Sequence, residues 1–170
     1  SGKVQRKYQI TKAPLTVETQ SDSKVYDGKP LTAPGTVKGF VEGENAELQV
    51  TGTQTAVGSS KNTYKIVWTE TTKADNYQVS ETVGTLTVTD QSIEDGKKIT
   101  VGTLGDVVYT GKNQKQEPAV TTKDGKTTLV KETDYTLSYS EDTKNVGEVT
   151  VTVTGKGNYS GKVQRKYQIT

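Results

Sequence analysis

Apolar and polar residues alternate with a period of two along much of this chain, a pattern that places successive side chains on opposite faces of a strand. Over residues 149–154 valine alternates with threonine, and over residues 135–139 tyrosine and leucine alternate with threonine and serine. Residues 64–68 and 85–89 repeat the pattern in the first half of the chain. The alternation predicts short strands with one buried face, and it assigns Trp68, the only tryptophan, to the core.

Turn-forming residues separate these predicted strands. The pair Asp124-Gly125 lies between residues 119–122 and 127–131, and an Asp-Gly pair in that setting predicts a hairpin. Residues 142–145 form a second polar turn segment. Threonine and valine, whose branched side chains favour strands, are frequent, and methionine is absent. Short strands joined by tight turns predict an all-β fold, arranged as an antiparallel sandwich.

The chain also repeats itself. Its first eleven residues, SGKVQRKYQIT, recur without a substitution as residues 160–170. A weaker repeat relates the two halves: residues 25–29, VYDGK, return as residues 108–112, VYTGK, and an Asn-Tyr pair occurs late in each half. The residues of this repeated structural motif are Tyr26, Gly28, Tyr77, Tyr109, Gly111 and Tyr159.

These repeats predict the domain organisation. Residues 12–89 form one small sandwich module and residues 90–170 a second, in tandem and elongated. Because residues 160–170 complete the second module as its closing strand, residues 1–11 are expected to be the closing strand of a preceding repeat. Such a strand has Val4, Tyr8 and Ile10 to bury. We expect it to be disordered, to extend the first module, or to exchange with the identical strand of another molecule, giving a strand-swapped dimer of an otherwise monomeric protein.

Charge and composition exclude several classes of function. The formal net charge is +2, from 22 basic and 20 acidic residues spread along the chain, so no basic stripe for nucleic acid is present. The absence of Cys and His removes thiolate ligands, the commonest metal ligand and the usual general base. No apolar run is long enough to span a membrane. We therefore predict no catalytic, cofactor-binding or metal site, no cofactor, and neither a nucleic-acid nor a membrane partner.

Several residues are nevertheless candidates for binding calcium, a sugar or an anionic partner. The acids Asp22, Glu42, Glu44 and Glu47 match no known calcium-ligand spacing. Tyr26 and Tyr109 are of the type that binds sugars, but we expect each to pack at a sandwich edge and to hydrogen-bond through its hydroxyl. The basic residues of the repeated segment are expected to form a solvated strand face rather than a site for an anionic partner; they are Lys3, Arg6 and Lys7 and their counterparts Lys162, Arg165 and Lys166.

The sequence resembles repeats of bacterial surface proteins. The second module, with VVYTGKNQKQEPAV and KETDYTLSYSEDTKNVGEVTVTVTGKGNYSG, is similar to a bacterial Ig-like repeat. The first, with SKVYDGKPLTAPG and KADNYQVSETVGTLTVT, is similar to YDG and MBG-type modules. The resemblance covers nearly the whole chain and implies Ig-like β-sandwich modules strung in tandem in adhesins and biofilm proteins of Gram-positive bacteria.

The resemblance implies a function as well. The expected role is that of a non-catalytic stalk, secreted, anchored to the cell wall and extracellular, which projects a binding region from the cell and touches neighbouring repeats of its own chain. The alternative is that the repeats are themselves adhesive and bind host glycan, mucin, matrix protein or neighbouring cells, with avidity from many weak contacts. In either case the host or cell-surface ligand of the whole protein is unknown.

Overall fold

The computed structural model describes residues 2–170. Of residues 1–11, the expected closing strand of a preceding repeat, only Ser1 lies outside the described residues. Almost all regular structure is β, with one 3-10 turn, η1 (Ala74–Asn76). The chain divides into two compact units. The first holds the residues up to Lys24 together with Pro30–Thr87, and the second holds Val25–Lys29 together with Val88–Thr170. The predicted all-β, sandwich-like fold is confirmed.

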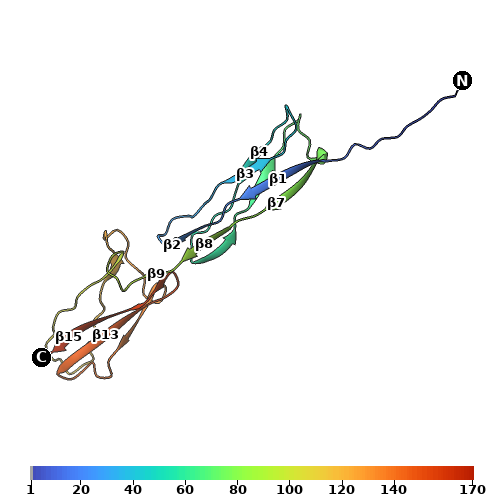
Figure 1. Ribbon diagram of the computed structural model, residues 1–170. Helices are drawn as coiled ribbons and strands as arrows, with labels where there is room; N and C mark the ends of the chain where they lie inside the picture. Colours follow the sequence, from blue (N-terminus) through green and yellow to red (C-terminus); the bar gives the residue numbers. More distant parts are fainter. Residues whose placement is uncertain (1) are drawn as a thin grey trace. The chain divides into compact units, whose positions relative to one another are not determined.

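The first half of the chain builds three small sheets (Figure 1). One has β1 (Ala13–Thr19) between β3 (Gly35–Lys38), which is antiparallel to it, and β7 (Tyr77–Thr82), which is parallel. Another orders its strands as β2 (Asp22–Val25), β8 (Thr85–Thr89) and β5 (Gly58–Lys61). The third pairs β4 (Glu47–Val50) with β6 (Tyr64–Val67).

Alternation explains which side chains of these strands form the core. Leu15, Val17 and Thr19 on β1 are buried, and the residues between them are exposed. On β8, Leu86 and Val88 are buried in the same way. A shift of one residue in either register would turn these side chains to solvent, so the pattern specifies the pairing.

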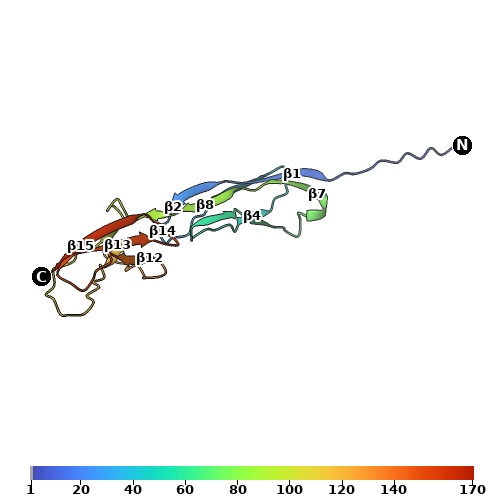
Figure 2. The same ribbon diagram turned by 90° about the horizontal axis from the view of Figure 1, so that it is seen from below.

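The second unit also contains three small sheets. The largest orders β12 (Tyr135–Tyr139), β13 (Gly147–Gly155) and β15 (Lys162–Ile169), all antiparallel to their neighbours; Figure 2 shows β13 beside β15. The others pair β10 (Ile99–Val101) with β11 (Val120–Thr122) and, in parallel, β9 (Gln91–Ser92) with β14 (Tyr159–Ser160). The parallel pairing of β1 with β7 and of β9 with β14 departs from a purely antiparallel arrangement.

The predicted alternation along residues 149–154 is confirmed. Val149, Val151 and Val153 are buried, and the threonines between them are only partly buried. Val153 packs in one cluster with Ile93 and Tyr135, and Val149 and Val151 pack in another with two residues of β15. The long strand β13 therefore contributes to both halves of the core of the second unit.

One interpretation of the closing strand is wrong. Lys162 and Lys166 on β15 are exposed as expected, but Arg165 is half-buried on the inner side, in phase with buried Tyr167. Its guanidinium donates from Nε and Nη2 to the carbonyl of Val101, at 3.2 and 2.7 Å, and from Nε to that of Gly102 at 3.2 Å. Arg165 thus satisfies backbone acceptors at the end of β10 rather than facing solvent.

Candidate functional site

The repeated Tyr-x-Gly motif builds the same turn twice. Gly28 and Gly111 both have φ of 75°, a conformation that glycine adopts without the steric cost of a Cβ. The hydroxyl of Tyr26 lies 3.9 Å from the place a Cβ on Gly28 would occupy, and that of Tyr109 lies 3.8 Å from the same place at Gly111. Gly28 and Gly111, which the internal repeat marks in the sequence, are therefore required by the backbone of the turn.

Each turn is tied to the last residue of a closing strand. The backbone N–H of Tyr26 donates to the carbonyl of Thr89 at 2.8 Å, and that of Tyr109 donates to the carbonyl of Thr170 at 2.9 Å. The surroundings of the two rings differ. Tyr26 is half-buried, whereas Tyr109 is 48% exposed. The two turns are alike in backbone and unlike in what covers them.

Tyr159 is the residue that covers Tyr26. Both belong to the second unit, and their ring centroids lie 5.5 Å apart with the planes at 83°, an edge-to-face contact. Aromatic pairs favour this arrangement because the positive edge of one ring meets the negative face of the other. Burial raises the pKa of the Tyr159 hydroxyl, with the Tyr26 hydroxyl as a smaller cause. Tyr159 lies on β14, opposite Gln91 of β9.

The corresponding tyrosine of the first unit, Tyr77, sits in a cluster of aromatic rings. Trp68 stacks on it at 5.8 Å and Phe40 meets it edge-on at 5.4 Å. The Tyr77 hydroxyl donates to Glu44 Oε2 at 2.6 Å and accepts from the backbone N–H of Val41 at 3.2 Å. Burial, and then the Glu44 carboxylate, raise the pKa of Tyr77. Trp68 and Phe40 are half-buried, and both pack against Tyr77, which is buried.

A cavity of about 940 Å³ opens in the second unit beside the Tyr26 turn. Its wall is formed by residues 25–29, by Tyr159 and by a set of lysines from two loops, Lys97, Lys98, Lys123 and Lys126. The lining combines two tyrosines with five lysines and two acids, Asp27 and Asp124, so cationic side chains outnumber acidic ones. This excess of positive charge suits a polar, anionic ligand. Sequence reasoning missed this site because its lysines are scattered along the chain and only the fold gathers them.

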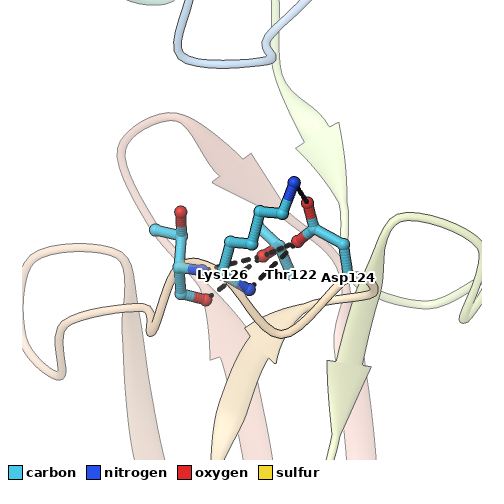
Figure 3. Close-up of polar contacts among 4 residues, drawn as sticks. Thr122, Asp124 and Lys126 are labelled. Atoms are coloured by element: carbon cyan, nitrogen blue, oxygen red, sulfur yellow. Dashed lines mark hydrogen bonds and ion pairs between the residues drawn. The ribbon is translucent and has the colours of Figure 1, made fainter.

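Asp124, one of the two acids that line this cavity, holds a turn together. The hydroxyl of Thr122 donates to Asp124 Oδ1 at 2.7 Å, and the backbone N–H of Lys126 donates to the same oxygen at 3.1 Å, as Figure 3 shows. The hydrogen bond from Thr122, followed by that from Lys126, lowers the pKa of Asp124. The N–H of Thr122 donates to the carbonyl of Thr127 at 2.8 Å, which confirms the predicted hairpin. Asp124 therefore serves the loop rather than proton transfer.

Other tyrosines form the hydroxyl bonds expected of Tyr26 and Tyr109. The hydroxyl of Tyr167 donates to the carbonyl of Gln114, and the hydroxyl of Tyr139 donates to that of Gln116 at 2.9 Å. Both acceptors belong to the loop before β11. These bonds attach an irregular segment of the second unit to its main sheet.

Asn62 is a structural residue that nothing in the sequence marks. It is fully buried, and its amide nitrogen donates to the carbonyls of Gln20 at 2.8 Å and Ala33 at 3.0 Å. Its backbone carbonyl accepts from the hydroxyl of Thr19 at 2.7 Å. Through its side chain and its backbone, Asn62 thus joins three segments of the first unit. It lies in a short polar stretch that reads as an ordinary turn.

The described part of the chain contains none of the groupings that support metal chemistry. Within residues 2–170 no three carboxylate, histidine or cysteine side chains gather where they could hold an ion. Two of the four acids considered for calcium have other partners: Glu44 accepts from the Tyr77 hydroxyl, and Glu47 accepts from the Gln49 side chain at 3.0 Å. In the same residues no helix has the length and apolar character that crossing a membrane requires.

Comparison with known proteins finds a similarity in the first half of the chain. A search of curated proteins finds no match. The family model of the MBG domain (YGX type) matches residues 15–87, a stretch that begins on β1, includes the Tyr26 turn and the Tyr77 cluster, and ends on β8. This confirms the MBG-type resemblance of the first module: residues 15–87 are similar to an MBG domain of the YGX type.

Proposed function

We propose that the chain is a non-catalytic spacer of a bacterial cell-surface adhesin, secreted and attached to the cell wall, which projects a binding region away from the cell. The match to an MBG domain supports an extracellular repeat module of surface proteins, a domain type that is not enzymatic. The observation that carries the proposal is that the same turn occurs twice. In each copy the backbone N–H of the tyrosine donates to the carbonyl of a threonine, Tyr26 to Thr89 and Tyr109 to Thr170. A structural unit that repeats with its closing bond intact is suited to stacking in series.

The connection between successive strands suits a spacer as well. Only Asp90 separates β8, which ends at Thr89, from β9, which begins at Gln91. The chain passes between the two compact units at three places, residues 24–25, 29–30 and 87–88, and none of them is a Gly/Ser-rich stretch. A long Gly/Ser linker, by contrast, would behave as a flexible coil. The proposed function therefore rests on length and stiffness.

Small-angle X-ray scattering tests the spacer role. Two modules with strands of about ten residues, joined end to end, should span about 70 Å at roughly 3.3 Å per residue. We expect an extended particle of fixed length. The matched control inserts five Gly/Ser residues at each of the three passages between the units, after Lys24, Lys29 and Thr87, which should broaden the distribution of distances. A compact or freely bent wild-type chain, scattering like the control, contradicts the proposal.

The alternative, that the repeats are themselves adhesive, is favoured by one observation. The cavity beside Tyr26 and Tyr159 is lined by several lysines, which suits sulfated or sialylated glycans such as those of mucin. Charge reversal of Lys97 and Lys98 should abolish binding on an array of acidic glycans, and salt should weaken it. Reversal of Lys3 and Lys7, which lie outside the cavity, is the matched control. Binding that survives the first pair of changes contradicts this role for the cavity.

A further inference from the structure

We propose that the Tyr109 turn, residues 108–112, is a docking element that seats on the aromatic cluster of a second copy of this chain, formed by Phe40, Trp68 and Tyr77. The inference rests on the proposed spacer function, in which copies follow one another. It adds the contact by which one copy would hold the next.

The first argument is that the equivalent segment already packs in this manner. Val25–Lys29 begins with the last residue of β2, yet it belongs to the second compact unit and not to the first. There Tyr26 meets Tyr159 edge to face at 5.5 Å. The Tyr-x-Gly turn of the first module therefore packs as part of the second unit.

The second argument is that the Tyr109 turn is already formed but uncovered. It shares with the Tyr26 turn the φ of its glycine and the hydrogen bond from the tyrosine N–H to the closing threonine. Its side chains face solvent, with Val108 73% and Tyr109 48% exposed. A rigid, exposed pair of apolar side chains loses little conformational entropy when it binds, which favours docking.

The third argument locates the receiving surface. Tyr159, on which Tyr26 packs, lies opposite Gln91, which is separated from Thr89 only by Asp90. Tyr77 lies opposite Ala13 in a parallel pair of the same kind, and Ala13 is separated from Thr11 only by Lys12.

Thr11 ends the segment whose sequence is identical to the one that ends at Thr170. In a chain that continues from Thr170 as it continues here from Thr11, Tyr109 would face the parallel pair that holds the next Tyr77. Tyr77 itself is only 3% exposed because Phe40 and Trp68 pack against it, so these two rings form the surface that Tyr109 would meet.

The chemistry of that surface fits the incoming residues. Phe40 and Trp68 are half-buried beside Tyr77, and Val41 next to them is exposed. The incoming side chains of Tyr109 and Val108 would cover aromatic and aliphatic surface that is otherwise exposed to water. The occupant is thus a copy of this chain rather than an unrelated partner.

A tandem protein tests the proposal, with residues 1–170 followed directly by residues 12–170. This junction reproduces the natural sequence around Thr11 and Lys12 without added residues. Trp68→Phe in the first copy leaves one tryptophan, in the receiving surface of the second.

Tyr109→Ala in the first copy should then shift the Trp68 emission to longer wavelength. It should also raise the unfolding equilibrium constant of that receiving unit by about threefold to tenfold, the range for losing an aromatic pair.

The same substitution placed in the second copy, which no copy follows, is the matched control and should change neither reading. Val108→Glu in the first copy repeats the test with an exposed residue, in case Tyr109→Ala unfolds its own unit. The proposal is overturned if all variants show the same Trp68 emission wavelength and the same unfolding equilibrium constant of the receiving unit. It is also overturned by an equal effect from either copy, because Tyr109 would then act within its own unit. Scattering from the single chain tests the spacer role separately, so failure of the docking contact can be told from failure of the function.

Discussion

Tyr8 and Tyr167 occupy the same place in two identical eleven-residue sequences, yet Tyr8 is 88% exposed and Tyr167 is 2% exposed. Tyr167 is covered because β15 pairs with β13 along its whole length, and its hydroxyl bonds to the loop at Gln114. Residues 2–11 form no strand, and their side chains are exposed. Identical sequences thus have opposite environments, and the difference lies in whether a partner strand is available.

The first prediction concerns removal of the duplicated ends. Deleting residues 1–11 should leave the thermal unfolding of both units unchanged, because those described here have no strand partner. Deleting residues 160–170, whose sequence is the same, should unfold the second unit, since it removes β15 with buried Tyr167 and Ile169. If refolding at high concentration yields a dimer by strand exchange, the first deletion should abolish it in light scattering. Loss of the first unit on deletion of residues 1–11 would show that this segment belongs to it.

The second prediction concerns the buried amide of the first unit. Asn62→Ala leaves the carbonyls of Ala33 and Gln20 without their donor. The bond to Ala33 is buried, and losing it should cost about 1–3 kcal/mol, whereas the partly buried carbonyl of Gln20 should cost less because water can reach it. We expect a large loss of stability in chemical denaturation of that unit. Lys61→Ala changes the exposed neighbour and should have little effect. Comparable stability of the two variants would contradict the role given to Asn62.

The third prediction uses the two copies of one arginine. Arg165→Ala should lower the free energy of unfolding of the second unit by about 1.5–3 kcal/mol, since a charged donor to the carbonyls of Val101 and Gly102 is lost. Arg6→Ala makes the same change in the exposed segment and should have no measurable effect. Denaturant titration of both variants decides the point. If the two changes are equivalent, Arg165 contributes nothing through its backbone contacts.

The fourth prediction concerns alkaline pH. Burial, and then the hydrogen bond to Glu81, raise the pKa of Tyr64 to about 12 from its ordinary 10.0. Because the folded state holds the phenol proton more tightly, this contribution to stability is complete below pH 10 and is lost as pH rises towards 12. Tyr64→Phe should therefore flatten the fall in stability of the first unit over that interval, measured by thermal unfolding. An unchanged alkaline profile in the variant would contradict the assignment.

The sequence alone determined the strands, some turns and the repeat. The alternation over residues 149–154 fixes which face of β13 is buried, because a strand has a period of two and one face must leave water. The Asp124-Gly125 hairpin follows from local conformational preference. The repeated Tyr-x-Gly motif marks a turn with positive φ, which favours glycine. Each of these rests on interactions between residues that are close in the chain.

The tertiary structure decided which residues meet across the chain. The local sequence of residues 2–11 is identical to that of the segment containing β15, so it cannot predict that only one of them pairs. The local sequence of Val25–Lys29 likewise does not predict that this segment packs with the second unit. The burial of Asn62, the inward side of Arg165 and the gathering of lysines around Tyr26 also depend on segments distant in sequence. The physical reason is that burial, hydrogen-bond partners and local charge are properties of the surroundings, and the surroundings of a residue are set by the strands folded against it.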